Sequence, residues 1–430
     1  MTTYSSEWLL PISQEPIHRG WVSVDAGRIT GVGTHERRSS APEVIDLGRA
    51  AILPALVNVH THLELSYLDG RVPAGTTFTR WVRTLMALRR QYPDPAAPEI
   101  LSAVRDAIVA ARASGTGLLG DISNTLVTVP LLRDAGMPAQ VFHELLGFNV
   151  VDPAARVGAA AVAALNAGNP AEAGPHDVRS PANRDVRVTL AAHAPYSVSP
   201  AMFRAIRTAV DGQAAPLTCV HLGESADEVE FLKHGTGSFR ALLEELGVWA
   251  EDWEAPGNSP VGYLSDLGFL DRCALVVHGV QFDGGDLSRL QALGTTVASC
   301  PRSNVHVGVG SPPLEAFYAM DVSVAFGTDS LASVADLNLF SELKEARRIA
   351  PRVPASRLLE SATLIGARAL GFGDDFGSID VGRRASLIAV SIPAGVDDVE
   401  EYLVGGIGPD AIRWLDGETP NSQFPTPKGP

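Results

Sequence analysis

Eight short runs of Val, Leu, Ile and Ala recur along the chain, and each run ends in a polar or ionisable residue. Longer stretches with helical spacing of apolar residues separate them, among them 99–113, 202–210 and 337–349. Continuous apolar character is typical of parallel strands buried on both faces, and strands that alternate with helices form βα units. Eight units predict an α/β fold, a (β/α)8 TIM-type barrel with its polar residues at the carboxyl ends of the strands. The runs cover 51–60, 115–121, 138–144, 186–193, 217–221, 273–278, 296–304 and 322–329.

The parts of the 430-residue chain outside the predicted barrel are too small for a second enzyme. We place the barrel at 53–370, which leaves 1–52 before it and 371–430 after it. The first flank has two alternating runs about the turn Asp25-Ala26-Gly27, which is typical of a β-hairpin, and 377–390 has a similar pattern. We therefore expect both termini to form one small β-sandwich domain, followed by a C-terminal tail.

Charge and hydropathy exclude several classes of protein. The net charge is −15 and the chain has three lysines, which disfavours a groove for nucleic acid. No run reaches the roughly 18 to 20 apolar residues of a membrane span, and the start of the sequence lacks a signal-peptide pattern. We expect a cytoplasmic enzyme with a small-molecule substrate and no nucleic-acid or membrane partner, and the sequence is compatible with a homo-oligomer.

Four of the polar residues form a candidate set of metal ligands. His60 and His62 alternate on a strand, so their imidazoles project to the same side. His221 and Asp329 each follow an apolar run at the point where a strand would open into the cavity. Each residue alone is compatible with a structural role, but together they offer three imidazoles and one carboxylate. This set suits one divalent ion, with Zn²⁺ expected first and Fe²⁺ or Mn²⁺ as alternatives.

The order of these residues resembles the amidohydrolase superfamily over nearly the whole chain. Members carry His-x-His on the first strand, His on the fifth and sixth, and Asp on the eighth, and many have a small β domain built from both termini. Members with two metals bridge them with a carboxylated Lys on the fourth strand, where this chain has His193, and no lysine precedes Lys233. The resemblance implies one metal per chain, as in the deaminase branch. The matching positions are His60, His62, His221, His278 and Asp329.

Glu224 lies three residues beyond His221, and the spacing alone leaves two roles open. It could cap a helix that begins near Ala226, or it could reach the metal site. The His-x-x-Glu of the deaminases is similar to this motif and implies that Glu224 shuttles a proton from water to a ring nitrogen of the substrate. His278 would then stabilise developing charge, with a buried structural role as its alternative, and Asp329 would also relay a proton to departing ammonia.

Further motifs bear on the substrate. The segment His193-Ala-Pro-Tyr196 resembles the S-adenosylhomocysteine and methylthioadenosine deaminases, in which the His touches the substrate. Segments 300–304 and 327–330 resemble the same branch, which includes chlorohydrolases, and they supply Arg302, Asn304 and Ser330 as candidate substrate contacts. Segment 60–66, followed by 78–81, is more similar to the aminofutalosine deaminases of menaquinone biosynthesis, which convert 6-amino-6-deoxyfutalosine to futalosine.

The sequence leaves the roles of several further residues undecided. Glu64 could accept hydrogen bonds from ribose hydroxyls, or it could be a carboxylate at the rim of the site. Trp81 could close over the base or belong to the core of a helix. A substrate carboxylate could pair with Arg302, or with Arg71 and Arg80.

Three other functions are alternatives to deamination of 6-amino-6-deoxyfutalosine. The first is a deaminase of S-adenosylhomocysteine or methylthioadenosine, and the second is an amide hydrolase or chlorohydrolase on the same metal core. The third is a non-catalytic scaffold on a barrel fold, which the full set of ligands argues against.

Overall fold

The computed structural model describes residues 1–34, 43–74, 77–168 and 185–415, so the predicted tail lies mostly outside the described residues. The chain packs as two compact units. The first unit comprises Met1–Asn58, Val109–Leu118 and Asn338–Pro430, and the second comprises Val59–Ile108 and Leu119–Leu337. The predicted domain limits at 53 and 370 stay a prediction.

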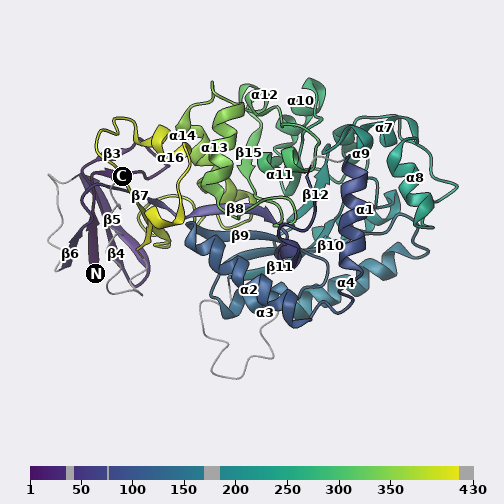
Figure 1. Cartoon of the computed structure of the whole chain (residues 1–430), viewed down its shortest axis with the longest axis horizontal. Coiled ribbons are helices and arrows are strands. Elements are labelled where there is room, and N and C mark those ends of the chain that lie inside the picture. The colour runs from purple at the N-terminus through teal and green to yellow at the C-terminus, as the bar shows by residue number, and fades with distance from the viewer. Residues whose placement is uncertain (35–42, 75–76, 169–184, 416–430) are drawn as a thin grey trace. The chain divides into compact units, whose positions relative to one another are not determined.

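Two four-stranded sheets carry the second unit, in the orders β11-β10-β9-β8 and β12-β13-β14-β15 (Figure 1). Neighbouring strands run parallel from β9 to β11 and from β12 to β15. Every residue of β9 and β10 is buried, which explains why apolar residues run through both strands on both faces. The polar residues among them, such as Asp121 and Glu144, are buried as well. The strands are β8 (Leu56–Thr61), β9 (Thr116–Ser123), β10 (Ala139–Leu145), β11 (Val186–Ala192), β12 (Thr218–Leu222), β13 (Ala274–His278), β14 (Thr296–Ser299) and β15 (Ser323–Phe326).

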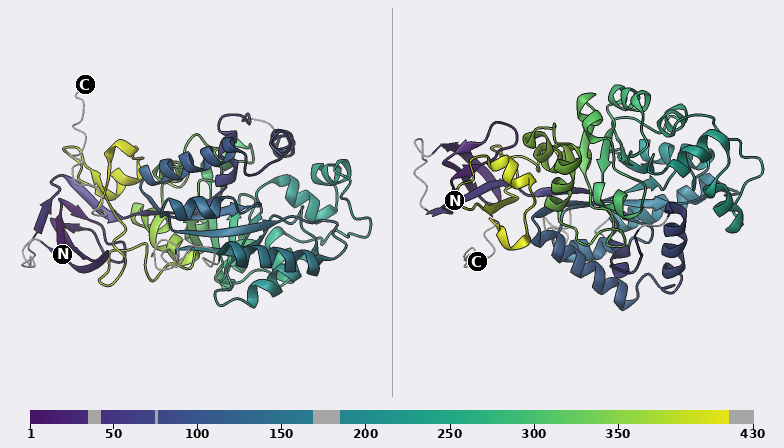
Figure 2. Two further views of the ribbon diagram at one scale, coloured as in Figure 1. Left: turned by 90° about the horizontal axis from the view of Figure 1, so that it is seen from below. Right: turned by 45° about the horizontal axis from the view of Figure 1, so that its top comes forward.

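Helices alternate with these strands, as predicted. The helices α3 and α4 pack against β11, and α12 packs against β15 (Figure 1). The strands lie among helices in both views of Figure 2. The helices are α1 (Phe78–Arg89), α2 (Pro98–Ala113), α3 (Thr128–Asp134), α4 (Pro153–Gly168), α6 (Pro200–Asp211), α7 (Ala226–His234), α8 (Ser238–Glu245), α9 (Pro260–Asp266), α10 (Gly284–Leu293), α11 (Pro301–His306), α12 (Leu314–Ala319), α13 (Leu339–Ile349), α14 (Ala355–Glu360), α15 (Gly366–Ala369) and α16 (Val399–Val404). Short helical turns are η2 (Leu63–Leu68), η4 (Ser361–Ile365) and η5 (Pro409–Ala411).

Two of the predicted runs end differently from expectation. Run 51–60 is split between two sheets, as β7 (Ala50–Pro54) of the first unit and β8. Run 296–304 ends as a strand at Ser299, because Pro301 opens α11 and its fixed φ suits the first turn of a helix. Arg302 and Asn304 therefore lie on a helix and not on a strand.

Backbone hydrogen bonds bring the ends of distant strands together in the second unit. The His221 amide donates to His193 O at 2.9 Å, which joins the end of β11 to β12. The amides of Thr328 and Asp329 both donate to His60 O, at 3.0 and 2.9 Å, which joins the end of β15 to β8. The polar residues that follow these strands consequently face a common space.

The first unit contains two sheets, in the orders β5-β4-β1-β6 and β17-β16-β7-β2-β3. The hairpin about residues 25–27 is confirmed as β4 paired antiparallel with β5. The second hairpin is wrong: β16 pairs antiparallel with β7 and β17, because Gly377 and Gly382, at φ 91° and 94°, belong to turns. The strands are β1 (Thr2–Ser5), β2 (Trp8–Leu9), β3 (Ile17–His18), β4 (Gly20–Asp25), β5 (Arg28–Thr34), β6 (Glu43–Asp46), β16 (Leu387–Ser391) and β17 (Ile412–Trp414).

Both flanks of the sequence contribute to the core of the first unit. Val22 and Ile29 of one sheet share a buried cluster with Ile52 and Leu387 of the other. The predicted joining of the two termini is confirmed by the β7–β16 pairing, while the sandwich arrangement stays a prediction.

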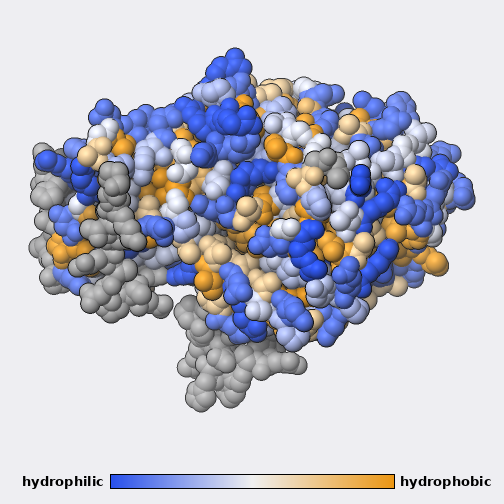
Figure 3. Space-filling view, viewed as in Figure 1, coloured by the Kyte–Doolittle hydropathy of each residue, from blue (hydrophilic) through white to orange (hydrophobic). Residues whose placement is uncertain are grey.

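Hydrophilic residues predominate on the face that Figure 3 shows. In Figure 3 the apolar side chains on the visible face are separated by hydrophilic ones. Within the described ranges, the helices are all too short or too polar to cross a bilayer.

Candidate active site

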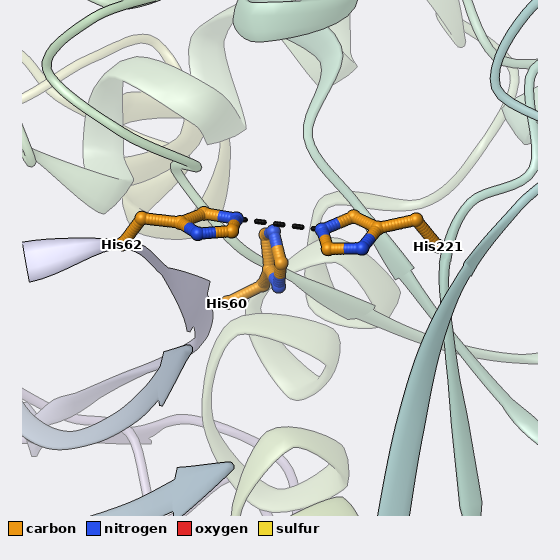
Figure 4. Close-up of side chains that lie close together, drawn as sticks. All are labelled: His60, His62 and His221. Atoms are coloured by element: carbon orange, nitrogen blue, oxygen red, sulfur yellow. Dashed lines mark hydrogen bonds between the residues drawn. The ribbon is translucent and has the colours of Figure 1, made fainter. Parts of the chain in front are cut away.

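Three histidines converge in the second unit (Figure 4). His60 lies near the end of β8, His62 directly follows that strand, and His221 lies on β12. The Nε2 atoms of His62 and His221 face each other at 3.4 Å. One ring nitrogen from each of the three residues lies within 4.8 Å of the other two. Alternation along β8 gives His60 and His62 the same side of the strand, as predicted.

The donor chemistry of this cluster fits a divalent metal ion. Burial, together with the neighbouring imidazoles, lowers the pKa of His60, and burial also lowers the pKa of His62, so both rings are neutral. His221 Nδ1 lies 3.0 Å from His193 O, so it carries the proton that it donates and leaves Nε2 with a free lone pair. Two nitrogens held tetrahedrally by one ion at about 2.0–2.1 Å would lie roughly 3.4 Å apart, as His62 and His221 do.

Asp329 completes the group of potential ligands. Its Oδ1 lies 3.7 Å from His62 Nε2 and 4.0 Å from His60 Nε2. Ser303 Oγ donates to Oδ2 at 2.7 Å and the Ser330 amide donates to Oδ1 at 2.7 Å, so the carboxylate is held in one orientation.

Two residues of the site have left-handed backbone conformations. His278 has φ 79° and Asp329 has φ 64°, and neither is a glycine. Such conformations cost on the order of 1–3 kcal/mol each and persist where the surrounding structure holds them, most often at functional sites. The strain therefore supports a functional role for both side chains.

Glu224 and His278 form a pair beside the histidine cluster. His278 Nε2 lies 3.6 Å from Glu224 Oε1. Asn304 Nδ2 donates to His278 Nδ1 at 2.9 Å, which places the imidazole proton on Nε2, facing Glu224. Burial lowers the pKa of His278 to about 3, so the ring is a neutral hydrogen-bond donor. Burial raises the pKa of the Glu224 carboxyl, and the charges of Asp329 and Glu228 add to the shift.

The segment between β12 and α7 fixes the position of Glu224. Both carboxylate oxygens of buried Glu228 accept backbone hydrogen bonds, from Gly223 at 2.9 Å and from Glu224 at 3.1 Å. Ser225 is the N-cap of α7 and accepts from the Glu228 amide at 3.2 Å. The alternative role of Glu224 as the helix cap is therefore wrong.

One cavity of about 350 Å³ opens onto these residues. Its polar wall contains His62, His193, His221, Glu224, His278, Asp329 and Ser330. Its apolar wall is one face of α1, with side chains three or four residues apart at Phe78, Trp81, Val82, Leu85 and Met86. The cationic Arg89 continues the same face at the end of the helix. We call this space the metal-site cavity.

Comparison with known proteins identifies the family. The model of the amidohydrolase family matches residues 51–406. The chain belongs to this family. It is therefore an amidohydrolase, a hydrolytic enzyme that acts on carbon–nitrogen bonds, as the order of its histidines predicts.

Several known proteins are similar to this amidohydrolase over most of their length. An aminodeoxyfutalosine deaminase of Deinococcus radiodurans is 29% identical over 336 residues, which cover 75% of this chain and 74% of that protein. A 5-methylthioadenosine/S-adenosylhomocysteine deaminase of Halobacterium salinarum is 28% identical over 390 residues, 87% of this chain and 80% of the relative. The crystal structure of an adenosine deaminase from Xanthomonas campestris with bound zinc superposes with a TM-score of 0.77 at 25% identity, over 96% of this chain and 90% of that one.

The predicted substrate contacts separate into two groups. His193, Ser330 and Trp81 line the metal-site cavity of the amidohydrolase. His193 Nδ1 lies 2.6 Å from Ser197 Oγ, and burial lowers the pKa of His193 to about 4. Trp81 is largely buried and stacks on Phe78, so it belongs both to the core of α1 and to the cavity wall.

The side chains of Asn304 and Arg302 contact other residues of this chain. Asn304 is fully buried and reaches the site through its hydrogen bond to His278. Arg302 Nη1 pairs with Asp336 Oδ1 at 2.9 Å, and the residue does not line the metal-site cavity. Their position on α11 favours structural and orienting roles over direct contact with substrate.

Glu64 also faces away from the metal-site cavity. Its carboxylate accepts from Ser123 Oγ at 2.9 Å, from the amides of Asn124 and Thr125 at 3.1 and 3.2 Å, and from Thr125 Oγ1 at 2.8 Å. These four bonds favour the alternative role, a carboxylate that organises the loop after β9, over the predicted contact with ribose.

Three residues of the site were missed by sequence reasoning. Glu144 on β10 places Oε1 3.4 Å from His221 Nδ1, Ser303 holds Asp329, and Arg89 ends the lining face of α1. The end of run 138–144 marked Glu144 as a polar residue at a strand end. Arg89 shared the 3.6-residue spacing of α1, but nothing in the sequence indicated which face of that helix would meet the cavity.

Replacing Ser303 by Ala should weaken metal binding or activity by about 10- to 100-fold, because the hydrogen bond that orients Asp329 is lost. Competition for zinc with a chromophoric chelator would measure the affinity. Ser288→Ala, on α10, removes an exposed hydroxyl and serves as the control. Equal affinities for the two variants would show that Ser303 does not support the site.

Proposed function

We propose that this amidohydrolase is a metal-dependent hydrolytic deaminase of an amino-purine nucleoside, with 6-amino-6-deoxyfutalosine as the leading substrate and futalosine and ammonia as products. The observation that carries the proposal is the convergence of Glu224, His278 and Asp329 on the histidine cluster in one cavity. The similarity to two deaminases, of aminodeoxyfutalosine and of 5-methylthioadenosine/S-adenosylhomocysteine, supports the choice of reaction.

In this proposal one ion, with zinc expected first, is held by His60, His62, His221 and Asp329. The zinc in the related adenosine deaminase supports the choice of metal. A divalent ion at this place would lower the pKa of water from 15.7 to about 7 and so supply a nucleophile at neutral pH.

The side chains of the site would carry the protons of the reaction. Glu224 takes a proton from the attacking water and transfers it to a ring nitrogen of the base. His278, with its Nε2 proton fixed by Asn304, donates a hydrogen bond to the oxygen that gains negative charge. Asp329 would take the second proton from the hydroxyl added to the ring carbon and pass it to the amino group. The carbon–nitrogen bond then breaks, the carbonyl forms, and ammonia departs.

We also propose that the two parallel sheets of the second unit form one (β/α)8 barrel around this site. The bonds from β12 to the end of β11, and from the segment after β15 to β8, support that arrangement. Family membership supports it as well.

One metal ion per chain is the expected stoichiometry. Two further groups of potential ligands occur among the described residues. His60, His278 and Asp329 form a group that shares two residues with the proposed ligand set, so it would compete for the same ion. The group of Glu144, His193 and His221 would require His221 Nδ1, and that nitrogen already donates to a carbonyl. Metal analysis of zinc-reconstituted protein after gel filtration should give one ion. Two ions per chain at full occupancy would contradict the proposed ligand set.

Ammonia release tests the function directly. The metal-replete enzyme would be assayed on aminodeoxyfutalosine, methylthioadenosine, S-adenosylhomocysteine, adenosine, guanine and cytosine. The proposal predicts the highest kcat/KM for aminodeoxyfutalosine, and preferred turnover of methylthioadenosine or S-adenosylhomocysteine would select the second candidate. That candidate rests on the similarity to the H. salinarum enzyme over 87% of the chain. Release of chloride or of a ring-opened carboxylate, without ammonia, would instead indicate a chlorohydrolase or an amide hydrolase.

A further inference from the structure

A second cavity of about 440 Å³ adjoins the metal-site cavity, and Leu65, Arg89 and Arg90 belong to the walls of both. The metal-site cavity, at about 350 Å³, is near the lower limit of ordinary ligand pockets, which hold roughly 300–1,000 Å³. A substrate larger than a simple nucleoside would therefore extend past Arg89 into the second cavity. We call this second space the arm pocket.

The arm pocket has apolar and aromatic walls. Tyr67 and Tyr92 pack with ring centroids 4.9 Å apart and planes tilted by 59°. Ile100 and Val127 complete the apolar lining. These walls suit an apolar or aromatic group, because flat rings pack well against tilted aromatic side chains.

The charge at the junction of the two cavities is positive. Arg89 Nη2 donates to Asn124 Oδ1 at 3.2 Å and lies 3.5 Å from Glu64 Oε1, and a guanidinium has five N–H donors, so further donors remain. Arg90 is exposed and has no ion pair among the described residues. Two guanidiniums against the single carboxylate of Glu64 leave an excess positive charge, in a chain whose net charge is −15.

Glu64 orients Arg89 and leaves N–H donors of its guanidinium available. The carboxylate already accepts four hydrogen bonds from the loop after β9, and its ion pair with Arg89 is longer than any of these. The guanidinium is thereby oriented beside both cavities, which lowers the entropy cost of pairing with a ligand.

We propose that the arm pocket binds the far end of the substrate, an apolar or aromatic arm that carries a carboxylate, and that Arg89 pairs with that carboxylate. This inference rests on the proposed function in that the nucleoside itself occupies the metal-site cavity. It replaces the arginines predicted from sequence: Arg302 is held by Asp336, and Arg71 and Arg80 line neither cavity.

Kinetics with matched substrates test the assignment. Arg89→Met should lower kcat/KM for aminodeoxyfutalosine by about 10- to 100-fold, and should change kcat/KM for its methyl ester and for methylthioadenosine by less than about threefold. Arg83→Met is the matched control, because Arg83 lies on the same helix with the same exposed fraction, 38%, and pairs with Glu245 away from both cavities. Equal losses on acid and ester, or no loss on the acid, would overturn the role of Arg89.

A binding measurement keeps this inference separate from the proposed function. Benzoate and benzamide would be titrated into metal-loaded wild type, Arg89→Met and Arg83→Met, with binding followed by ligand-observed NMR. Any contact with the metal is common to the three proteins, so a difference reports the arginine. Benzoate should bind Arg89→Met about 10- to 100-fold more weakly than it binds the other two, while benzamide should bind all three alike. Identical benzoate binding would reject the arm pocket, whereas absence of ammonia release from every nucleoside in the wild type would reject the proposed function alone.

Discussion

Glu224→Gln is expected to retain its metal and to lose deamination by about 10²- to 10⁴-fold. The amide keeps the shape of the side chain, and the backbone of residue 224 remains held by Glu228. What disappears is the group that accepts a proton from water and returns it to the substrate. Steady-state kinetics on the best substrate of the panel, together with metal analysis of the same sample, would measure both effects.

Glu230→Gln provides the control for this variant. Glu230 is an exposed carboxylate on α7, bonded to Thr236, and lies outside the cavity. Its replacement should leave turnover unchanged within about twofold, since exposed substitutions rarely propagate to a distant site. Full turnover by Glu224→Gln would remove Glu224 from the mechanism, and loss of metal by that variant would show that the residue supports the ligands instead.

Gly327→Ala is expected to destabilise the second unit by about 1–3 kcal/mol and to weaken metal binding. A Cβ at this position would lie 2.6 Å from His60 Cβ, 2.8 Å from His60 O and 2.9 Å from His60 N. Two of these three atoms belong to the backbone, so the collision cannot be relieved by a rotamer change. Only glycine allows the end of β15 to approach β8, and displacement of β8 would move two of the proposed ligands.

Thermal unfolding of the metal-free protein and chelator competition would measure the two effects of Gly327→Ala. Gly284→Ala is the control, because a Cβ at Gly284, in the first turn of α10, meets nothing within 4 Å. If both variants unfold and bind zinc alike, the close approach of β15 to β8 does not constrain the site.

The convergence of the candidate metal ligands could be predicted from the sequence because these residues lie at or directly after the ends of strands. Apolar runs are easy to recognise, and parallel strands bring their carboxyl ends to one edge, so the positions of His60, His221 and Asp329 follow from pattern alone. The relation of His278 to Glu224 required the structure, since it depends on the rotation of two side chains toward each other.

Contacts from loops and helices were predicted less well. The helix that carries Arg302 and Asn304 was not predicted, because the apolar run before them conceals the helix that Pro301 begins. Glu64 follows the His-x-His motif so closely that it suggested a substrate contact, but η2 turns its carboxylate toward the loop after β9. Sequence periodicity does not reveal which way such a short turn faces.

The first unit shows the same limit of prediction from local sequence patterns. The turn at residues 25–27 is local, and its hairpin was predicted. The partner of β16 is β7, more than three hundred residues away in sequence, and no local pattern specifies such a pairing.

The left-handed backbones of His278 and Asp329 place the stability of the fold in opposition to the chemistry proposed for these residues. Glycine would relieve the unfavourable conformation at either position, yet it would remove the side chain on which the proposed chemistry depends. Variants selected only for resistance to heat or proteolysis can therefore acquire glycine at these two positions and lose activity. Only selection for turnover retains the residue with the unfavourable backbone conformation. A screen for stable variants of this enzyme therefore needs a second step that selects for activity.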